Sequence, residues 1–381
     1  MNLVTLLQPP RIVIGNGCAS QCAGILAGLG VRRVLLVSST PVFPTLKTVL
    51  NALAFEEISV IQAAPIDREP DRAMFEIALQ LARAEQIDGV LGIGGGSAID
   101  VAKLIAALTK SQQRVEEVFG INLLNGRELP LVCLPTTAGT GAEVSPNAIL
   151  LDEAEELKKG VVSPHLVPDA ALVDPQLTVS VPPAVTAATG LDALTHCIEA
   201  FANKFSHPAV DVYALAGIRL ISANLRAAVE NGSDLNARAN LALGSLYGGL
   251  CLGPVNTAAI HALSYPLGGK YHIAHGVSNA VLLPGVLRFN LPSAPERYAE
   301  VALALGADCD SSAAGTAERG FIRLAGLSRA IGIPQKISEL GIPRSAIPEL
   351  ARGAMKVTRL LKNNLRPLTE PDAIGIYESA Y

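Results

Sequence analysis

The chain has no tryptophan, few aromatic residues (4%) and few charged residues (17%) among its 381 positions. Its net charge is −4, from 30 basic and 34 acidic residues, which excludes a strongly basic nucleic-acid-binding protein. No uncharged apolar run approaches the ~18 residues that a membrane span needs, and the start lacks the pattern of a signal peptide. We therefore expect no nucleic-acid partner, no membrane partner and a cytoplasmic location.

Paired cysteine motifs are also missing. The six cysteines are scattered along the chain without a Cys-x-x-Cys pair, so we expect them to be reduced and mostly buried. Half of the residues are hydrophobic (50%), and the length leaves room for about two domains. So apolar a chain can bury a large core and a subunit interface, and we expect a homodimer or a larger homo-oligomer.

The first half alternates strand and helix patterns. Such alternation predicts parallel strands joined by crossover helices, in a doubly wound α/β layer. Three further short segments rich in β-formers, 147–152, 158–163 and 170–174, are expected to extend or edge the same sheet. The predicted strands are 33–38, 58–61, 89–93 and 131–134, and the predicted helices are 41–53, 71–85 and 98–108.

The second half is rich in alanine and leucine and has few strand signals, which predicts an all-helical domain. We place the change near residues 178–185 and expect a dinucleotide-binding α/β domain over 1–181 and an all-α domain over 182–381. The predicted helices are 184–202, 209–230, 235–252, 293–305 and 313–331.

Three glycines and a serine, Gly94, Gly95, Gly96 and Ser97, follow the strand 89–93 and precede a helix. Glycines leave backbone N–H groups uncovered, and a helix N-terminus favours negative charge, so this turn suits a phosphate or a dinucleotide pyrophosphate. Ser97 is expected to cap the helix, in a box completed three residues later by an aspartate. A plain tight turn that needs glycine is the alternative.

A second loop of small and hydroxyl residues follows the strand 131–134. Its threonines, Thr136, Thr137 and Thr140, stand at the carboxyl end of a strand, where ligands bind in open α/β sheets. Threonine side chains can hydrogen-bond a ribose or a phosphate. The alternative is an ordinary loop of glycine and threonine.

Asp192 and His196 are four residues apart, so on a helix they share one face. A carboxylate and an imidazole on one face can hold a divalent cation, although the pair by itself favours a local Asp–His hydrogen bond. Three of the six histidines, His261, His272 and His275, lie within fifteen residues of one another. Asp192, His196 and two of these three would form a ligand set suited to Fe(II) or Zn(II), and the spacing leaves open which two.

Taken together, these motifs resemble the iron-containing (group III) alcohol dehydrogenase family, within the dehydroquinate synthase-like superfamily. The similarity covers most of the chain. It is carried by Gly94-Gly95-Gly96-Ser97-x-x-Asp100-x-Ala102-Lys103, Pro135-Thr136-Thr137-Ala138-Gly139-Thr140, Ala188-Thr189-Gly190-x-Asp192-Ala193-Leu194-Thr195-His196 and His275-Gly276-Val277-x-Asn279-Ala280.

The resemblance implies an N-terminal dinucleotide-binding domain, a helical C-terminal domain and an active site in the cleft between them. It implies the metal ligands Asp192, His196, His261 and His275 and a substrate contact near Asn147. The implied cofactor contacts are Gly95, Gly96, Ser97, Thr136, Thr137, Thr140 and Lys158.

Two departures from the family pattern concern the proton path and the choice of cofactor. Many members carry a further histidine where this chain has Tyr265, so a cofactor ribose hydroxyl, Tyr265 or His272 is expected to relay the proton. Members selective for NAD often carry an aspartate after the first strand, where this chain has the neutral Ser39. A neutral residue admits a 2′-phosphate, so the cofactor is NAD or NADP.

The resemblance and the motifs together predict a metal-dependent oxidoreductase that moves hydride between NAD(P) and a small alcohol, aldehyde, ketone or oxoacid, with Fe(II) or Zn(II). One alternative is a maleylacetate-type oxoacid reductase that works without metal, against which Asp192 argues. A lyase related to dehydroquinate synthase would need a basic pocket that the helical half does not indicate. A non-catalytic nucleotide-binding protein is the remaining alternative.

Overall fold

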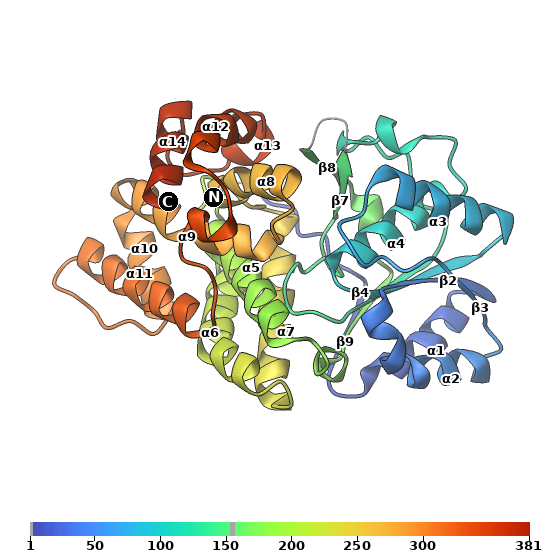
Figure 1. Ribbon diagram of the computed structural model, residues 1–381. Helices are drawn as coiled ribbons and strands as arrows, with labels where there is room; N and C mark the ends of the chain where they lie inside the picture. Colours follow the sequence, from blue (N-terminus) through green and yellow to red (C-terminus); the bar gives the residue numbers. More distant parts are fainter. Residues whose placement is uncertain (1–2, 153–156) are drawn as a thin grey trace. The chain divides into compact units, whose positions relative to one another are not determined.

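The structure is a computed structural model that describes residues 3–152 and 157–381. It divides into two compact units, each with its own interior (Figure 1). The first, which we call the N-terminal unit, is Leu6–Ser180. The second, which we call the helical unit, is Val181–Tyr381 together with the first residues of the chain.

A six-stranded sheet in the order β1-β9-β6-β4-β2-β3 forms the centre of the N-terminal unit, and all of its strand pairs are parallel. Its strands are β1 (Arg11–Ile14), β2 (Arg33–Ser38), β3 (Ser59–Gln62), β4 (Gly89–Gly94), β6 (Leu131–Pro135) and β9 (Ala170–Val173). Its helices are α1 (Gln21–Gly28), α2 (Lys47–Phe55), α3 (Arg72–Ala84) and α4 (Gly96–Leu108). The expected doubly wound layer is confirmed.

Helices cover both faces of this sheet, and the alternation of side chains along β2 shows how. Val34 and Leu36 point to the face that packs with α1 and α2. Leu35 and Val37 point to the opposite face, which packs with α3 and α4. Because both faces are buried, the central strands are continuous apolar runs rather than alternating ones.

Two of the three segments expected to extend or edge the main sheet lie elsewhere. β7 (Asn147–Asp152) and β8 (Leu157–Val162) pair antiparallel and form a separate three-stranded sheet with β5 (Gly120–Ile121). The third segment, β9, lies inside the main sheet between β1 and β6. Strand propensity predicts an extended backbone but not the partner strand, and that is why the assignment was wrong.

The helical unit contains helices and no strand within its described residues, apart from an isolated bridge between Asn203 and Asn364. Five of its helices, α8, α9, α12, α13 and α14, are absent from the sequence-based prediction, and two of them contain an interior proline, Pro266 in α8 and Pro284 in α9. The helices are α5 (Pro183–Phe201), α6 (Pro208–Glu230), α7 (Leu235–Leu252), α8 (Ala259–Tyr271), α9 (His275–Asn290), α10 (Pro295–Ala304), α11 (Ala313–Ala330), α12 (Ile347–Met355), α13 (Thr358–Leu361) and α14 (Glu370–Ser379).

One described helix, α6, is long and apolar enough by length and composition to cross a membrane. In the structure it packs against α5 and α7, and its side of the interior includes Ile218, Ile221 and Leu225. A single helix of this kind is weak evidence for a membrane, because interior helices of globular proteins meet the same criteria. Five of the six cysteines are buried and all six are free thiols, as expected.

Candidate functional site

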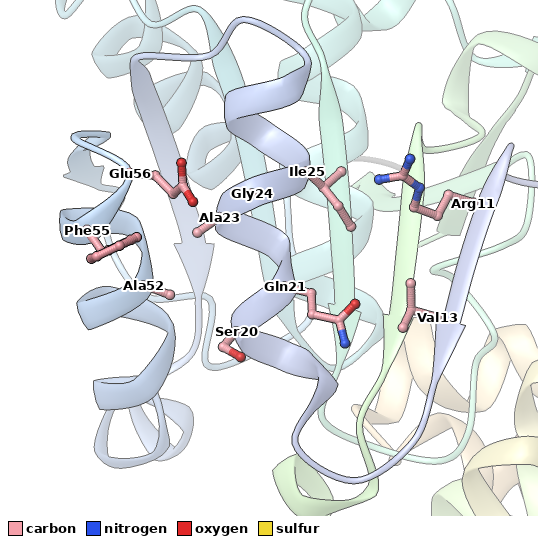
Figure 2. A pocket seen from close by; sticks show the side chains of 10 residues that line it. All are labelled: Arg11, Val13, Ser20, Gln21, Ala23, Gly24, Ile25, Ala52, Phe55 and Glu56. Atoms are coloured by element: carbon pink, nitrogen blue, oxygen red, sulfur yellow. The ribbon is translucent and has the colours of Figure 1, made fainter.

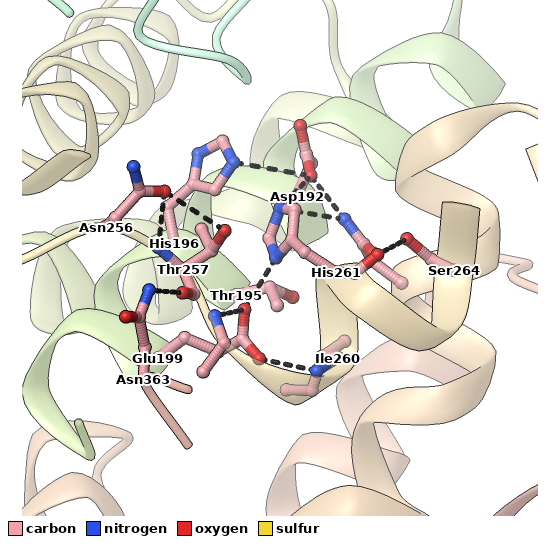
Figure 3. A network of polar contacts seen from close by, with 12 residues as sticks. Asp192, Thr195, His196, Glu199, Asn256, Thr257, Ile260, His261, Ser264 and Asn363 are labelled. Atoms are coloured by element: carbon pink, nitrogen blue, oxygen red, sulfur yellow. Dashed lines mark hydrogen bonds and ion pairs between the residues drawn. The ribbon is translucent and has the colours of Figure 1, made fainter. Parts of the chain in front are cut away.

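Asp192 contacts several imidazole rings in the helical unit, and Figure 3 shows it beside two of them, His196 and His261. Its Oδ1 lies 3.7 Å from His196 Nε2, 3.6 Å from His261 Nε2 and 3.7 Å from His275 Nε2. Three helices supply these residues. Asp192 and His196 come from successive turns of α5, His261 comes from the first turn of α8, and His275 is the first residue of α9.

The group is compact and mostly buried. Asp192, His196 and His261 are each at most 5% exposed, whereas the side chain of His275 is 27% exposed. The ligand atoms of Asp192, His261 and His275 all lie within 4.8 Å of one another. The His196 and His261 rings stack at 4.8 Å, and the His275 ring meets His261 edge-on at 5.1 Å. Of the three clustered histidines, His261 and His275 therefore join Asp192 and His196.

Charge couples these side chains strongly. Burial by itself raises the pKa of Asp192, but His196, His275 and His261 outweigh burial and hold that pKa far below its usual range. Burial likewise lowers the pKa of His261, but hydrogen bonds to Asp192 and Glu199 outweigh it and raise the pKa to about 9. The site thus concentrates cation-binding donors around one buried carboxylate.

The sequence analysis assigned no role to two residues that contact this group. Glu199 accepts a hydrogen bond from the His261 ring at 2.6 Å. Asn279 donates through Nδ2 to Asp192 Oδ1 at 2.7 Å. Helical spacing could have found both, because Glu199 is three residues after His196 and Asn279 is four residues after His275.

The glycine turn of the N-terminal unit joins β4 to α4, as predicted. The N-cap of α4 is Gly95, which has an extended backbone and makes no side-chain cap, so the expected cap by Ser97 is wrong. Ser97 is the second residue of the helix. Asp100, the expected partner in the capping box, instead accepts a hydrogen bond from Ile149 N, and burial raises its pKa to about 7. The first backbone N–H groups of α4 are therefore not capped by a side chain.

The threonine loop lies directly against this turn. A Cβ on Gly96 would meet Thr140 at 2.6 Å, and a Cβ on Gly95 would meet Thr137 at 3.5 Å. The backbone N–H of Thr136 donates to Gly94 O at 2.9 Å, because β4 and β6 are neighbouring strands. The structure therefore brings the two sequence motifs together at the carboxyl ends of adjacent parallel strands.

Three other predicted residues of this unit lie on separate segments. Ser39 directly follows β2, which neighbours β4 in the sheet. Lys158 lies on β8, where its ammonium group pairs with Glu69 at 2.7 Å, so a contact with a cofactor stays a prediction. Asn147 begins β7, and its Oδ1 is buried with no hydrogen-bond partner among the described residues.

The two predicted proton carriers differ in position. Tyr265 lies on α8 one turn after His261, and its ring centroid is 6.0 Å from that of His275. The ring is 7% exposed and packs with Ala262 and Leu360. His272 ends α8 in the left-handed conformation (φ 54°) and is exposed to solvent. The structure therefore places Tyr265, but not His272, against the buried cluster.

A hollow of about 840 Å³ lies on the N-terminal unit beside β1, α1 and α2 (Figure 2). Its lining includes Arg11, Gln21, Ile25, Phe55 and Glu56. None of the predicted site residues lines it, and its lining contains no histidine or cysteine. This hollow is therefore separate from the predicted site residues at the glycine turn and around Asp192.

Comparisons with known protein families match both halves of the chain to the same family. Residues 9–175 match the family model described as iron-containing alcohol dehydrogenase. Residues 186–381 match the model described as Fe-containing alcohol dehydrogenase family, C-terminal. Together the two models cover nearly the whole sequence.

Two relatives and one solved structure align over nearly their full length. Long-chain-alcohol dehydrogenase 1 of Geobacillus thermodenitrificans is 40% identical, with 100% of this chain and 98% of the relative aligned. NAD-dependent methanol dehydrogenase of Bacillus methanolicus is 32% identical, with 98% of each chain aligned. A crystal structure of 1,3-propanediol oxidoreductase superposes over 100% of both chains with a TM-score of 0.96 at 34% identity. The chain therefore belongs to the iron-containing alcohol dehydrogenase family and is an oxidoreductase of alcohols and aldehydes.

Proposed function

We propose that this protein is a metal-dependent NAD(P) dehydrogenase of small alcohols and aldehydes, in which Asp192, His196, His261 and His275 hold one divalent ion. The observation that carries the proposal is the approach of three imidazole Nε2 atoms to within 3.6–3.7 Å of one Asp192 oxygen. In this proposal residues 1–181 form the dinucleotide-binding domain and residues 182–381 form the metal-binding catalytic domain.

The donors present fit such an ion. A four-coordinate ion with bonds of about 2.1 Å separates its ligand atoms by about 3.4 Å, close to the distances around Asp192. Imidazole and carboxylate donors suit both Fe(II) and Zn(II), and the family name favours Fe(II). When bound, the ion would act as a Lewis acid that stabilises negative charge on a substrate oxygen.

We assign roles in proton transfer and substrate contact to three further residues. The Tyr265 ring lies 6.0 Å from the His275 ring, centroid to centroid, and His272 is exposed to solvent, so we propose these two as the proton relay. Asn147 is proposed as a substrate contact, which its unpartnered buried Oδ1 supports. The proposed roles of Tyr265 and His272 rest on their positions in the helical unit, and that of Asn147 rests on its position in the N-terminal unit.

We propose that the glycine turn binds the pyrophosphate of NAD or NADP at Gly94, Gly95, Gly96 and Ser97. The open N-terminus of α4 supports this role, because its first backbone N–H groups have no side-chain cap. Nicotinamide supplies the hydride chemistry, and the protein supplies orientation. Further proposed contacts are Ser39, Thr136, Thr137, Thr140 and Lys158.

Gly96→Ala should weaken cofactor binding by about tenfold or more, equivalent to about 1.4 kcal/mol. The new Cβ would lie 2.6 Å from Thr140, so either the threonine loop or the turn must shift where the phosphate is expected. Fluorescence titration with NADH measures the effect. Gly28→Ala is the matched control, because a Cβ there meets nothing within 4 Å among the described residues. Equal affinity in the two variants would contradict the assignment.

Metal affinity should rise with pH. The pKa of His261 is raised to about 9 in the metal-free protein, so below that pH an incoming ion must displace a proton from His261. The apparent affinity should therefore increase by about tenfold per pH unit up to about 9 and then level off. Chelator competition with Zn²⁺ at pH 7 and pH 8 measures this slope, and an affinity independent of pH would contradict it.

The same pKa shift predicts how the metal-free fold responds to pH. The folded pKa of His261 lies above the usual 6.5, so its contribution to stability is complete below pH 6.5 and is lost as pH rises to about 9. Urea denaturation of the metal-free protein at pH 6 and pH 9 compares the two states. His261→Gln is the control, because it removes this titration and should reduce the loss of stability between pH 6 and pH 9. A free energy of unfolding that changes with pH equally in the two proteins would contradict the assignment to His261.

The substrate class is tested by NADH or NADPH formation across primary alcohols of increasing chain length. The proposal expects turnover with at least one alcohol–cofactor pair and the reverse reaction with the matching aldehyde. Thermal stabilisation by NADH without any turnover would instead support the non-catalytic alternative.

A homodimer or larger assembly and a cytoplasmic location also stay predictions, and light scattering tests the oligomeric state.

A further inference from the structure

Glu199 lies on the same face of α5 as two of the proposed metal ligands. It follows His196 by three residues and Asp192 by seven, so all three side chains emerge on one side of the helix. Glu199 is 4% exposed, so its carboxylate is buried. It lies beside the four proposed ligands and is not one of them. A buried carboxylate is costly unless several donors satisfy it.

Three donors satisfy Glu199, and all belong to the start of α8 (Figure 3). Oε1 accepts the backbone N–H of Ile260 at 2.6 Å. Oε2 accepts the backbone N–H of Ala258 at 3.0 Å and faces His261 Nδ1 at 2.6 Å. The N-cap residue of α8 is Ala258, which makes no side-chain cap. Glu199 therefore supplies from another helix the acceptor that an N-cap side chain normally provides.

The hydrogen bond to Nδ1 decides which nitrogen of His261 can bind a cation. Nδ1 must carry the proton that Glu199 accepts, so in the neutral ring the lone pair lies on Nε2. That atom is the one 3.6 Å from Asp192 Oδ1. Because the two backbone hydrogen bonds hold the carboxylate independently of the ring, the orientation of His261 is fixed before an ion arrives.

We propose that Glu199 is the positioning residue of the metal site, which fixes His261 in the tautomer and orientation that present Nε2 to the ion. The proposal rests on the proposed function, because it assumes that His261 is a metal ligand. Outer partners of this kind typically change metal affinity by roughly 10–100-fold when they are mutated. Glu199 thus holds both the first backbone N–H groups of α8 and the His261 ring through one carboxylate.

Glu199→Gln is the diagnostic change because it keeps the shape and removes one acceptor. The carboxylate faces donors with both oxygens, whereas glutamine has one oxygen and one NH₂ group. If the NH₂ group faces His261 Nδ1, the ring must take the opposite tautomer and Nε2 can no longer bind the ion. If it faces Ile260 N, two donors meet and the cap is lost. Either arrangement disturbs the start of α8.

The test uses Co²⁺ added to the chelator-treated full-length protein, followed by visible absorption and chelator competition. Glu199→Gln should weaken Co²⁺ binding by roughly 10–100-fold and alter the Co²⁺ spectrum. Asp234→Asn is the matched control, since Asp234 caps α7 through Asn236 N and Ala237 N and should leave both readouts unchanged. A Glu199→Gln protein with the affinity and spectrum of the unmodified protein would overturn the proposal.

Two further variants separate positioning from helix capping. Ala258→Ser combined with Glu199→Gln supplies a hydroxyl cap to α8, so it protects the fold but should still bind Co²⁺ weakly. Full recovery of affinity in this double variant would show that capping alone mattered and would overturn the proposal.

In a His261→Ala background, Glu199→Gln should cause no further loss, because Glu199 acts through that ring. An undiminished further loss would overturn the proposal while leaving the proposed function intact. An unmodified protein that binds no Co²⁺ would instead contradict the proposed function, and the inference with it.

Discussion

Asp192→Asn should leave the purified protein without bound metal and nearly without dehydrogenase activity. Asp192 is the only anion among the four proposed ligands, and one of its oxygens faces all three imidazoles. Asparagine keeps the shape but removes the negative charge that attracts the ion and offsets the histidines. The loss of metal affinity should exceed the roughly 10–100-fold that outer partners contribute.

Elemental analysis of the purified variant, combined with NADH formation from a primary alcohol, measures this effect. The asparagine variant should fold, because Asn279 can still hydrogen-bond to the amide oxygen where it now donates to Asp192. Asp234→Asn removes a carboxylate from a helix cap of the same unit and should retain metal and activity. An Asp192→Asn protein that keeps one ion per chain would show that the ligand assignment is wrong.

Gly276→Ala should destabilise the helical unit and empty the metal site together. A Cβ on Gly276 would lie 2.0 Å from Ala188 O and 2.6 Å from Ala188 C, both backbone atoms of α5. Backbone atoms cannot turn away as a flexible side chain can, so α9 must move away from α5. His275 is the adjacent residue and Asp192 lies one turn after Ala188, so the shift separates the two ligands.

The expected cost is about 1–3 kcal/mol of unfolding free energy, or more, as for other overpacked interiors. Urea denaturation and metal content, measured on the same preparation, test both consequences. Gly326→Ala is the control, because Gly326 lies inside α11 and a Cβ there meets nothing within 4 Å among the described residues. That change should be neutral or slightly stabilising. A Gly276→Ala protein as stable as the Gly326→Ala protein would contradict the close packing of α5 and α9.

The alternation of strands and helices in the first half of the sequence predicted the doubly wound layer correctly. Periodicity describes one segment at a time, however, and so it could not show that β7 and β8 pair with each other in a second sheet. The helix expected over 41–53 begins as a 3-10 turn at Thr40–Thr45, and α2 starts only at Lys47. Pro44 lies inside that turn, and proline removes a backbone donor.

The candidate site was predictable to the extent that it depends on helical spacing. The Asp192–His196 pair follows from an interval of four residues, but the choice among His261, His272 and His275 depends on tertiary structure. The αL residue His272 ends α8 and points the chain to a new helix, so His275 and not His272 reaches Asp192. Helical spacing places Glu199 on the same face of α5 as His196, but its hydrogen bonds to Ile260 and His261 join residues about sixty positions apart, so only the structure shows them.

Metal analysis of the purified protein, followed by an activity assay after chelation and after re-addition of Fe(II), tests the central claim most directly. The account predicts about one divalent ion per chain, loss of alcohol-dependent NADH or NADPH formation on stripping, and recovery on reconstitution. Full turnover by the stripped protein would contradict the assignment of Asp192, His196, His261 and His275 as a metal site on which catalysis depends.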